Sequence, residues 1–220
     1  MCITLTSFIS CSPQRQSGYV REPKAVRFKP DRTPLRYRSL TSMAREVNIK
    51  VRMMPTSSKA RKRAKVMRPT FITMHSTANH RTTATAMQHA KALNSGRLPT
   101  SWHFSVDTKM AVQHLPLSST AWHAGTAAGN NNSIGIEMCE SESVRGNHFR
   151  TWDRAAKLAA LLMKRYNIPL RRVVPHYHWY GKNCPKPLLD RGRPGAKWAW
   201  YISRVDYYYR CLNRGVPNRG

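Results

Sequence analysis

Two histidines and one cysteine are the residues of this sequence whose types best suit a metal site. His75 ends the apolar segment TFITMH at residues 70–75, and His176 and Cys184 lie in the turn-rich segment HYHWYGKNCP at residues 176–185. Imidazole and thiolate groups are good Zn²⁺ ligands, and three protein ligands with an open fourth position are typical of a catalytic zinc. A packed or surface histidine and a buried apolar thiol are the alternative interpretation, and spacing alone does not decide between the two.

A glutamate in a strand-like segment is the second residue with chemical potential. The segment SIGIEMC at residues 133–139 alternates, and successive side chains of a strand point to opposite faces. Its isoleucines and its methionine therefore share one face, while Gly135 and Glu137 share the other. Packing explains a carboxylate there poorly, because a buried charge is costly, and the small Gly135 leaves space beside it. A surface glutamate is the simpler alternative.

The elements that must position these residues are expected to alternate between strands and helices. Apolar runs and alternation predict strands, and apolar residues at spacings of three and four predict helices. This pattern favours an α/β class, a single domain with a mixed central β-sheet covered by helices. The expected strands are residues 70–75, 102–107, 110–115 and 133–139, and the expected helices are residues 82–94, 151–167 and 195–213.

The helix expected at residues 151–167 has the clearest signals. Thr151 is expected to cap its N-terminus, and Asp153 suits the positive end of the helix dipole. An apolar stripe faces the core, so Asp153, Lys157 and Lys164 are expected on the solvent side.

The N-terminal region has a different composition. Residues 1–46 are rich in Arg, Pro and Ser and are expected to form a disordered basic extension. Residues 47–213 are expected to be the domain that carries the candidate site and residues 214–220 a tail, while residues 56–69 are expected to form another basic loop. We also consider that translation begins at Met43, which the intact mass of the native protein would test.

The net charge of +28 narrows the class of partner. A basic surface suits a polyanion, which would be nucleic acid or an anionic polymer of a bacterial envelope, whereas a solvated basic tail is the alternative without a partner. Five widely spaced cysteines without a CxxC pair do not resemble a disulfide framework, so we expect reduced thiols or a metal ligand. The N-terminus has no convincing signal peptide, and no apolar run reaches the length of a transmembrane helix.

Five segments carry a resemblance to a known family. They are FITMHSTAN, SWHFSVDTKMAVQHLP, WHAG, NSIGIEMCE and VVPHYHWYGKNCP, in that order. Together they resemble the type-2 N-acetylmuramoyl-L-alanine amidases, which include phage endolysins and Bacillus-type autolysins and are related to the peptidoglycan recognition proteins. The resemblance runs from about Val47 to Leu189 and is expected to extend to the final helix. It implies a zinc enzyme that cleaves the amide between N-acetylmuramic acid and L-alanine in peptidoglycan.

The resemblance also assigns roles to residues. It implies that His75, His176 and Cys184 are the zinc ligands, that Glu137 is the general base, and that Lys182 stabilises developing negative charge. Two departures accompany it: His178 stands where relatives often carry an acid and would be a competing ligand for the metal, and the basic extension lies outside the resemblance. His103 and His123 match positions that line the family's groove, where they would bind substrate or orient the site. Trp102 and Trp122 would pack against sugar or peptide of the substrate, or in the core.

Three functions therefore remain in view from the sequence. An amidase is favoured, because a protein that only binds muropeptide has no need of a complete zinc triad. A nucleic-acid-binding protein would leave the ordered histidine, glutamate and cysteine blocks unexplained, so we expect no specific nucleic-acid partner. We expect a monomer that acts on the bacterial cell wall, either as a phage lysin or as an exported autolysin.

Overall fold

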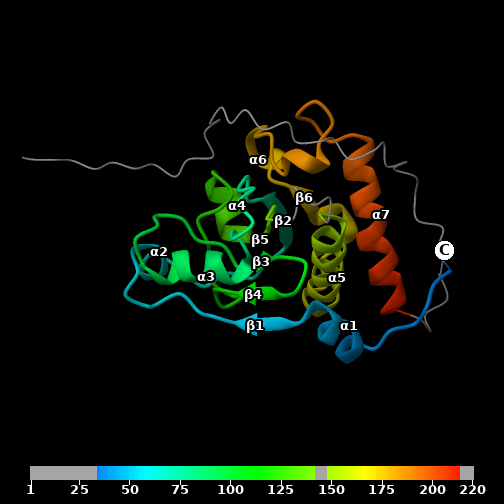
Figure 1. Cartoon of the computed structure of the whole chain (residues 1–220), viewed down its shortest axis with the longest axis horizontal. Helices are drawn as coiled ribbons and strands as arrows, with labels where there is room; N and C mark the ends of the chain where they lie inside the picture. The colour runs from blue at the N-terminus through cyan, green and yellow to red at the C-terminus, as the bar shows by residue number, and fades with distance from the viewer. Residues whose placement is uncertain (1–33, 142–147, 214–220) are drawn as a thin grey trace, which may run out of the picture.

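The fold is organised around a six-stranded β-sheet in this computed structural model, which describes residues 34–141 and 148–213 (Figure 1). The strands are β1 (Ile49–Val51), β2 (Phe71–Ser76), β3 (Phe104–Val106), β4 (Ala111–Gln113), β5 (Ser133–Met138) and β6 (Val173–Pro175). Their order across the sheet is β1-β4-β3-β5-β2-β6. The neighbouring pairs are parallel except β3 and β4, which are antiparallel. The expected mixed sheet is confirmed.

Helices cover both faces of this sheet. The helices are α1 (Leu40–Val47), α2 (Lys59–Lys62), α3 (Ala86–Asn94), α4 (Ala127–Asn132), α5 (His148–Tyr166), α6 (Tyr177–Tyr180) and α7 (Ala196–Cys211), with short 3₁₀ turns at Leu170–Arg172 and Lys186–Leu188. Helix α5 packs against the sheet and also against α1 and α7, and Figure 1 shows α5 and α7 side by side. Helix α3 contacts β3 and β4. None of the helices in the described part of the chain combines the length and apolar character that a membrane span requires.

The main core lies between one sheet face and α5. Ile72 pairs in register with Ile134, and Met74 pairs with Ile136, so all four side chains point to the same face. All four are fully buried, in one cluster with the apolar stripe of α5. Because these alternate residues fill the core, the residues between them must point to the opposite face.

Helix α3 shows how the expected boundaries shift. It was expected from Thr82 but begins at Ala86, where the side chain of Thr85 accepts a hydrogen bond from the backbone N–H of Gln88. A threonine in extended conformation satisfies one free donor of the first helical turn, so it stops the helix from extending toward the N-terminus.

Helix α5 corrects two expectations. Thr151 does not cap it, because the helix already includes His148 and Thr151 is buried inside it. The earlier start fits the packing of Phe149 against Trp200, with ring centroids 5.4 Å apart. Asp153 does not simply face solvent: its Oδ1 accepts hydrogen bonds from Arg204 and from the hydroxyl of Tyr208, both on α7. Sequence periodicity could not show that a second helix covers this side of α5.

Two basic segments are more ordered than their composition suggested. Within the expected extension, Leu40–Val47 form helix α1, with Met43 and Val47 fully buried against the main core. The expected boundary after residue 46 therefore falls inside a helix. Within the basic loop at residues 56–69, Ser58 caps helix α2 and Ala60 is buried. Composition hid both helices because few apolar residues anchor each of them. Residues 1–33 and 214–220 lie outside the described residues.

The cysteines agree with the expectation of reduced thiols where the structure describes them. Cys139, Cys184 and Cys211 are buried, and no disulfide joins them to one another. Cys2 and Cys11 lie outside the described residues.

Candidate active site

Four polar residues form a row across neighbouring strands. His75 on β2 pairs in register with Glu137 on β5, which pairs in turn with Ser105 on β3. On the other side of β2, the backbone N–H of His176 donates to the carbonyl of Met74, which extends the β6–β2 pairing by one residue. These residues occupy the face opposite the main core, so the sheet itself brings His176, His75 and Glu137 together.

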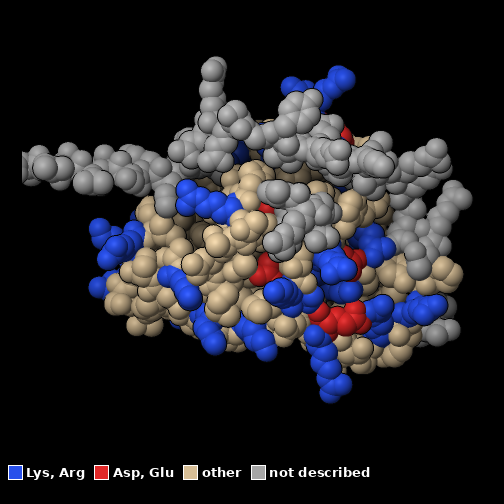
Figure 2. All heavy atoms as spheres, viewed as in Figure 1, with Lys and Arg blue, Asp and Glu red and all other residues tan. Residues whose placement is uncertain are grey.

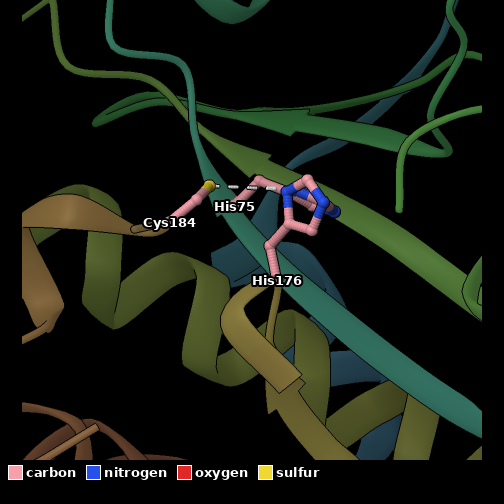
Figure 3. Close-up of side chains that lie close together, drawn as sticks. All are labelled: His75, His176 and Cys184. Carbon is pink, nitrogen blue, oxygen red and sulfur yellow. Dashed lines mark hydrogen bonds between the residues drawn. The ribbon is translucent and has the colours of Figure 1, made fainter. Parts of the chain in front are cut away.

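The three expected ligands converge within this row (Figure 3). The potential ligand atoms of His75, His176 and Cys184 all lie within 4.8 Å of one another, and the three residues are buried. The Nδ1 atoms of His75 and His176 are 3.0 Å apart, and Cys184 Sγ is 3.9 Å from His75 Nδ1. Figure 3 shows both imidazoles and the sulfur pointing toward one another from three separate segments.

Both histidines of this group are held neutral by their surroundings. Burial lowers the pKa of His75 well below its usual value, and the neighbouring His176, His123 and Lys182 lower it further. Burial, with the charge of Lys182, lowers the pKa of His176 to about 4. A neutral imidazole offers a lone pair, which is the form that binds a metal. The group therefore has the donors of a cation site.

Glu137 lies beside this group. Its Oε1 is 3.9 Å from His75 Nδ1, and its side chain is 17% exposed. Its Oε2 is buried and has no hydrogen-bond partner in the described part of the chain. Burial raises the pKa of Glu137 to about 8, although the charge of Lys182 acts in the opposite direction. A carboxyl group of this kind suits proton transfer near neutral pH.

Lys182 follows helix α6 at the edge of the site. Gly181 ends that helix with a positive φ of 81°, a conformation that glycine adopts readily, and so directs the chain back toward Cys184. The charge of Lys182 acts on His75, His176 and Glu137, since it lowers the pKa of all three. Its ammonium group therefore places positive charge near the carboxylate and the ligand group.

Two further histidines lie next to the site: His123 contacts His75, and His103 contacts strand β5. His123 Nδ1 is 2.9 Å from His75 Nε2, so His123 contacts a candidate ligand directly. His103 is fully buried, its Nδ1 accepts from the backbone N–H of Gly135, and its Nε2 lies 2.8 Å from the carbonyl of Ser119. With no exposed surface and both ring nitrogens occupied, His103 supports strand β5, which fits the orienting alternative that the sequence left open.

The two tryptophans that could pack against substrate make packing contacts within the protein. Trp102 is partly buried, and its indole N–H donates to Ser105 Oγ at 2.8 Å. Trp122 is also partly buried in the same apolar cluster, and the guanidinium of Arg63 lies 4.6 Å from the centre of its ring. Both contacts fit the packing alternative that the sequence left open.

His178 lies away from the ligand group. It is exposed, contacts Phe71 and Trp179, and lines an open cleft of about 390 Å³ beside α7. The group of converging ligand atoms contains His176 and not His178. His178 lies within the one-turn helix α6, whereas His176 precedes that helix, so the two side chains point in different directions.

Sequence reasoning missed two residues next to the site. The side-chain oxygen of Asn130 accepts hydrogen bonds from the backbone N–H groups of His123 and Ala124 at 2.9 and 2.7 Å. The ring of Tyr180 is 5.2 Å from that of His176, and this tyrosine is 53% exposed. Asn130 stands in the run GNNN, which suggested only a turn, and a single tyrosine carries no positional signal.

Curated relatives of this chain are named amidases. Among curated proteins, the N-acetylmuramoyl-L-alanine amidase CwlH of Bacillus subtilis is 44% identical over 147 residues, which cover 66% of this chain and 58% of the relative. The amidase XlyA of the same species is 46% identical over 126 residues, or 56% of this chain and 42% of the relative. The chain thus spans about half the length of these curated relatives.

Solved structures of an endolysin and of an amidase catalytic domain also resemble this chain. A mutant endolysin from Bacillus subtilis superposes with a TM-score of 0.66 at 41% identity, covering 72% of this chain and 99% of that chain. The catalytic domain of XlyA superposes with a TM-score of 0.65 at 40% identity and the same coverage. A family model described as N-acetylmuramoyl-L-alanine amidase matches residues 65–187, more than half of the sequence. This chain therefore belongs to the N-acetylmuramoyl-L-alanine amidase family.

Proposed function

We propose that this chain hydrolyses the amide bond between N-acetylmuramic acid and L-alanine in bacterial peptidoglycan, with a zinc ion held by His75, His176 and Cys184. The observation that carries the proposal is the convergence of three buried ligand atoms beside the carboxylate of Glu137. Membership of the amidase family and relatives that are named N-acetylmuramoyl-L-alanine amidases support the choice of bond.

The donor set fits zinc. Two neutral imidazoles and one thiolate are preferred zinc ligands, and three protein ligands leave a position free, as in catalytic sites. When bound, zinc acts as a Lewis acid toward a carbonyl oxygen and lowers the pKa of water. His75 and His176 present Nδ1 toward each other, 3.0 Å apart, and this separation matches two nitrogens that share one cation.

Glu137 is the proposed proton carrier. Its carboxylate accepts the proton that the attacking water loses and then donates it to the leaving nitrogen of L-alanine, so that the carboxylate is regenerated. Its Oε1 lies 3.9 Å from Nδ1 of the proposed ligand His75, so the carboxylate stays close to the ligand group through both steps. Its buried Oε2, which has no hydrogen-bond partner among the described residues, is available for this transfer.

Lys182 is the proposed electrostatic stabiliser. The carbonyl oxygen of the amide gains negative charge as water attacks, and a fixed positive charge nearby lowers the energy of that state. Lys182 supplies such a charge, because its ammonium group already acts on His75, His176 and Glu137.

Anionic polymers of the cell envelope are proposed as a secondary partner. Lys and Arg outnumber Asp and Glu by 38 to 10, and Figure 2 shows blue side chains spread over much of the visible described surface. Positive charge of this kind attracts a polyanion in a salt-dependent way. This positive charge supports retention of the protein near the wall. The monomeric state expected from the sequence stays a prediction.

A zymogram on bacterial cell walls tests the proposed function. The protein is renatured in a gel that contains purified walls, with and without a metal chelator, and zinc is then restored to the chelated lane. The proposal predicts a cleared band that the chelator removes and zinc restores. Binding without clearing would favour a recognition module, and clearing that ignores the chelator would contradict the role of zinc.

A further inference from the structure

A chain of hydrogen bonds links a backbone carbonyl to the candidate ligand His75. The Nε2 atom of His123 is 3.3 Å from the carbonyl oxygen of Ser133, at the start of β5. The Nδ1 atom of His123 is 2.9 Å from Nε2 of His75. The remaining nitrogen of His75, Nδ1, faces His176 Nδ1 and Cys184 Sγ. Two imidazoles thus lie in series between a carbonyl and the ligand group.

The chemistry of the carbonyl fixes every proton in this series. A carbonyl oxygen only accepts, so Nε2 of His123 must carry the hydrogen that it donates to Ser133. A neutral imidazole carries one N–H, so Nδ1 of His123 holds a lone pair and accepts from Nε2 of His75. His75 then has its lone pair on Nδ1, the nitrogen that faces the other two candidate ligands.

The surroundings hold His123 in this place. The backbone N–H of His123 donates to Oδ1 of Asn130 at 2.9 Å. Its ring lies against the backbone of Gly135, where an added Cβ would come within 2.8 Å of the His123 Cγ and Nδ1 atoms. No side chain other than hydrogen fits there without displacing the imidazole, which gives Gly135 a steric role on the site's face of β5.

We infer that His123 is a positioning residue that sets the tautomer and orientation of His75 and thereby raises the zinc affinity of the site. The inference rests on the proposed zinc site but goes further, because it gives His123 a role through His75 rather than through substrate. Groups that hydrogen-bond the distal nitrogen of a metal-binding histidine typically change metal affinity by about 10–100-fold.

The test compares zinc affinity, by competition with a chromogenic chelator, for the whole chain and three variants. His123→Leu removes the acceptor and should weaken zinc binding by about 10–100-fold. His123→Asn places an amide oxygen where Nδ1 stood, can accept from His75, and should restore most of the loss. His178→Ala removes an exposed imidazole two residues from His176 and should bind zinc like the unaltered chain. Circular dichroism of each metal-free variant checks that it is folded.

The outcomes separate this inference from the proposed function. Failure of the unaltered chain to bind zinc would overturn the zinc site itself. Normal affinity in His123→Leu, or equal weakness in His123→Leu and His123→Asn, would overturn the tautomer role alone. If His123→Leu does not fold, long-range ¹H–¹⁵N correlation spectra of the unaltered chain decide instead. They should show His75 and His123 both protonated at Nε2, and protonation of His123 at Nδ1 would overturn the inference.

Discussion

His75 and Glu137 stand at the same register position of two adjacent parallel strands, with His75 Nδ1 and Glu137 Oε1 3.9 Å apart. The ligand and the proposed base are thus fixed relative to each other by backbone pairing rather than by a flexible loop. Sites built on strands hold their geometry more accurately than sites on loops. The roles of the two residues can therefore be separated by mutation with little change in the fold.

Glu137→Gln tests the proton carrier. The amide keeps the shape of the side chain but cannot accept a proton, so hydrolysis of purified peptidoglycan should fall by about 10²–10⁴-fold. Zinc content, measured by atomic emission on the same sample, should be unchanged because Glu137 is not among the converging ligands. Digestion at the normal rate would remove Glu137 from this role.

Cys184→Ser tests the third ligand, with Cys211→Ala as its matched control. Both cysteines are buried, but only Cys184 joins the ligand group. We expect Cys184→Ser to lose zinc and wall lysis together, because a hydroxyl is a poorer zinc ligand than a thiolate. Cys211→Ala should keep both and lose only some thermal stability. Full zinc occupancy in Cys184→Ser would exclude its sulfur from the site.

Lys182→Met tests electrostatic stabilisation. Methionine keeps an unbranched side chain but removes the charge, so we expect kcat to fall by about 10²-fold with zinc retained. The measurement is the steady-state rate on a soluble muropeptide. Lys164→Met, on the far end of α5, serves as control and should leave kcat unchanged. A normal rate for Lys182→Met would show that its charge does not act in the reaction.

Asp153 should control stability in acid. Burial alone would raise the pKa of Asp153, but hydrogen bonds from Tyr208 and Arg204 and the charge of Lys157 outweigh burial and hold it below the usual 3.8. A carboxyl whose pKa is lower in the folded than in the unfolded state stabilises the fold above the unfolded pKa, and this stability is lost as the pH falls below about 3.8. Asp153→Asn should therefore lower the melting temperature at pH 7 and flatten its decline in acid. An unchanged acid profile would refute this.

A substitution at Tyr201 is expected to leave the stability of the fold unchanged or to raise it, whereas Asp153→Asn lowers it. Tyr201 is fully buried in the main core, and its hydroxyl has no hydrogen-bond partner within the described residues. A buried donor without a partner is destabilising, so Tyr201→Phe should be neutral or raise the free energy of unfolding by about 1 kcal/mol. Urea denaturation measures this. A clear loss of stability would mean that the hydroxyl does have a partner.

The sequence predicted the elements that carry His75 and Glu137 because both strands have clear local patterns. Strands β2 and β5 lie within one residue of their expected bounds at both ends. The row that joins them to His176 was not predictable, since β6 has only three residues and pairs with β2 about a hundred positions earlier. The contact between His75 and His123 is also non-local. Local propensity identifies strands, but tertiary pairing decides which side chains meet.

The central claim is tested most directly by the bond that is cut. Purified peptidoglycan is digested with the zinc-loaded chain, the chelated chain and the chelated chain with zinc restored, and new amino-terminal alanine and new reducing sugar ends are both measured. Our account predicts new amino-terminal alanine without new reducing ends, lost on chelation and recovered with zinc. Digestion by the zinc-loaded chain that releases no amino-terminal alanine would contradict it.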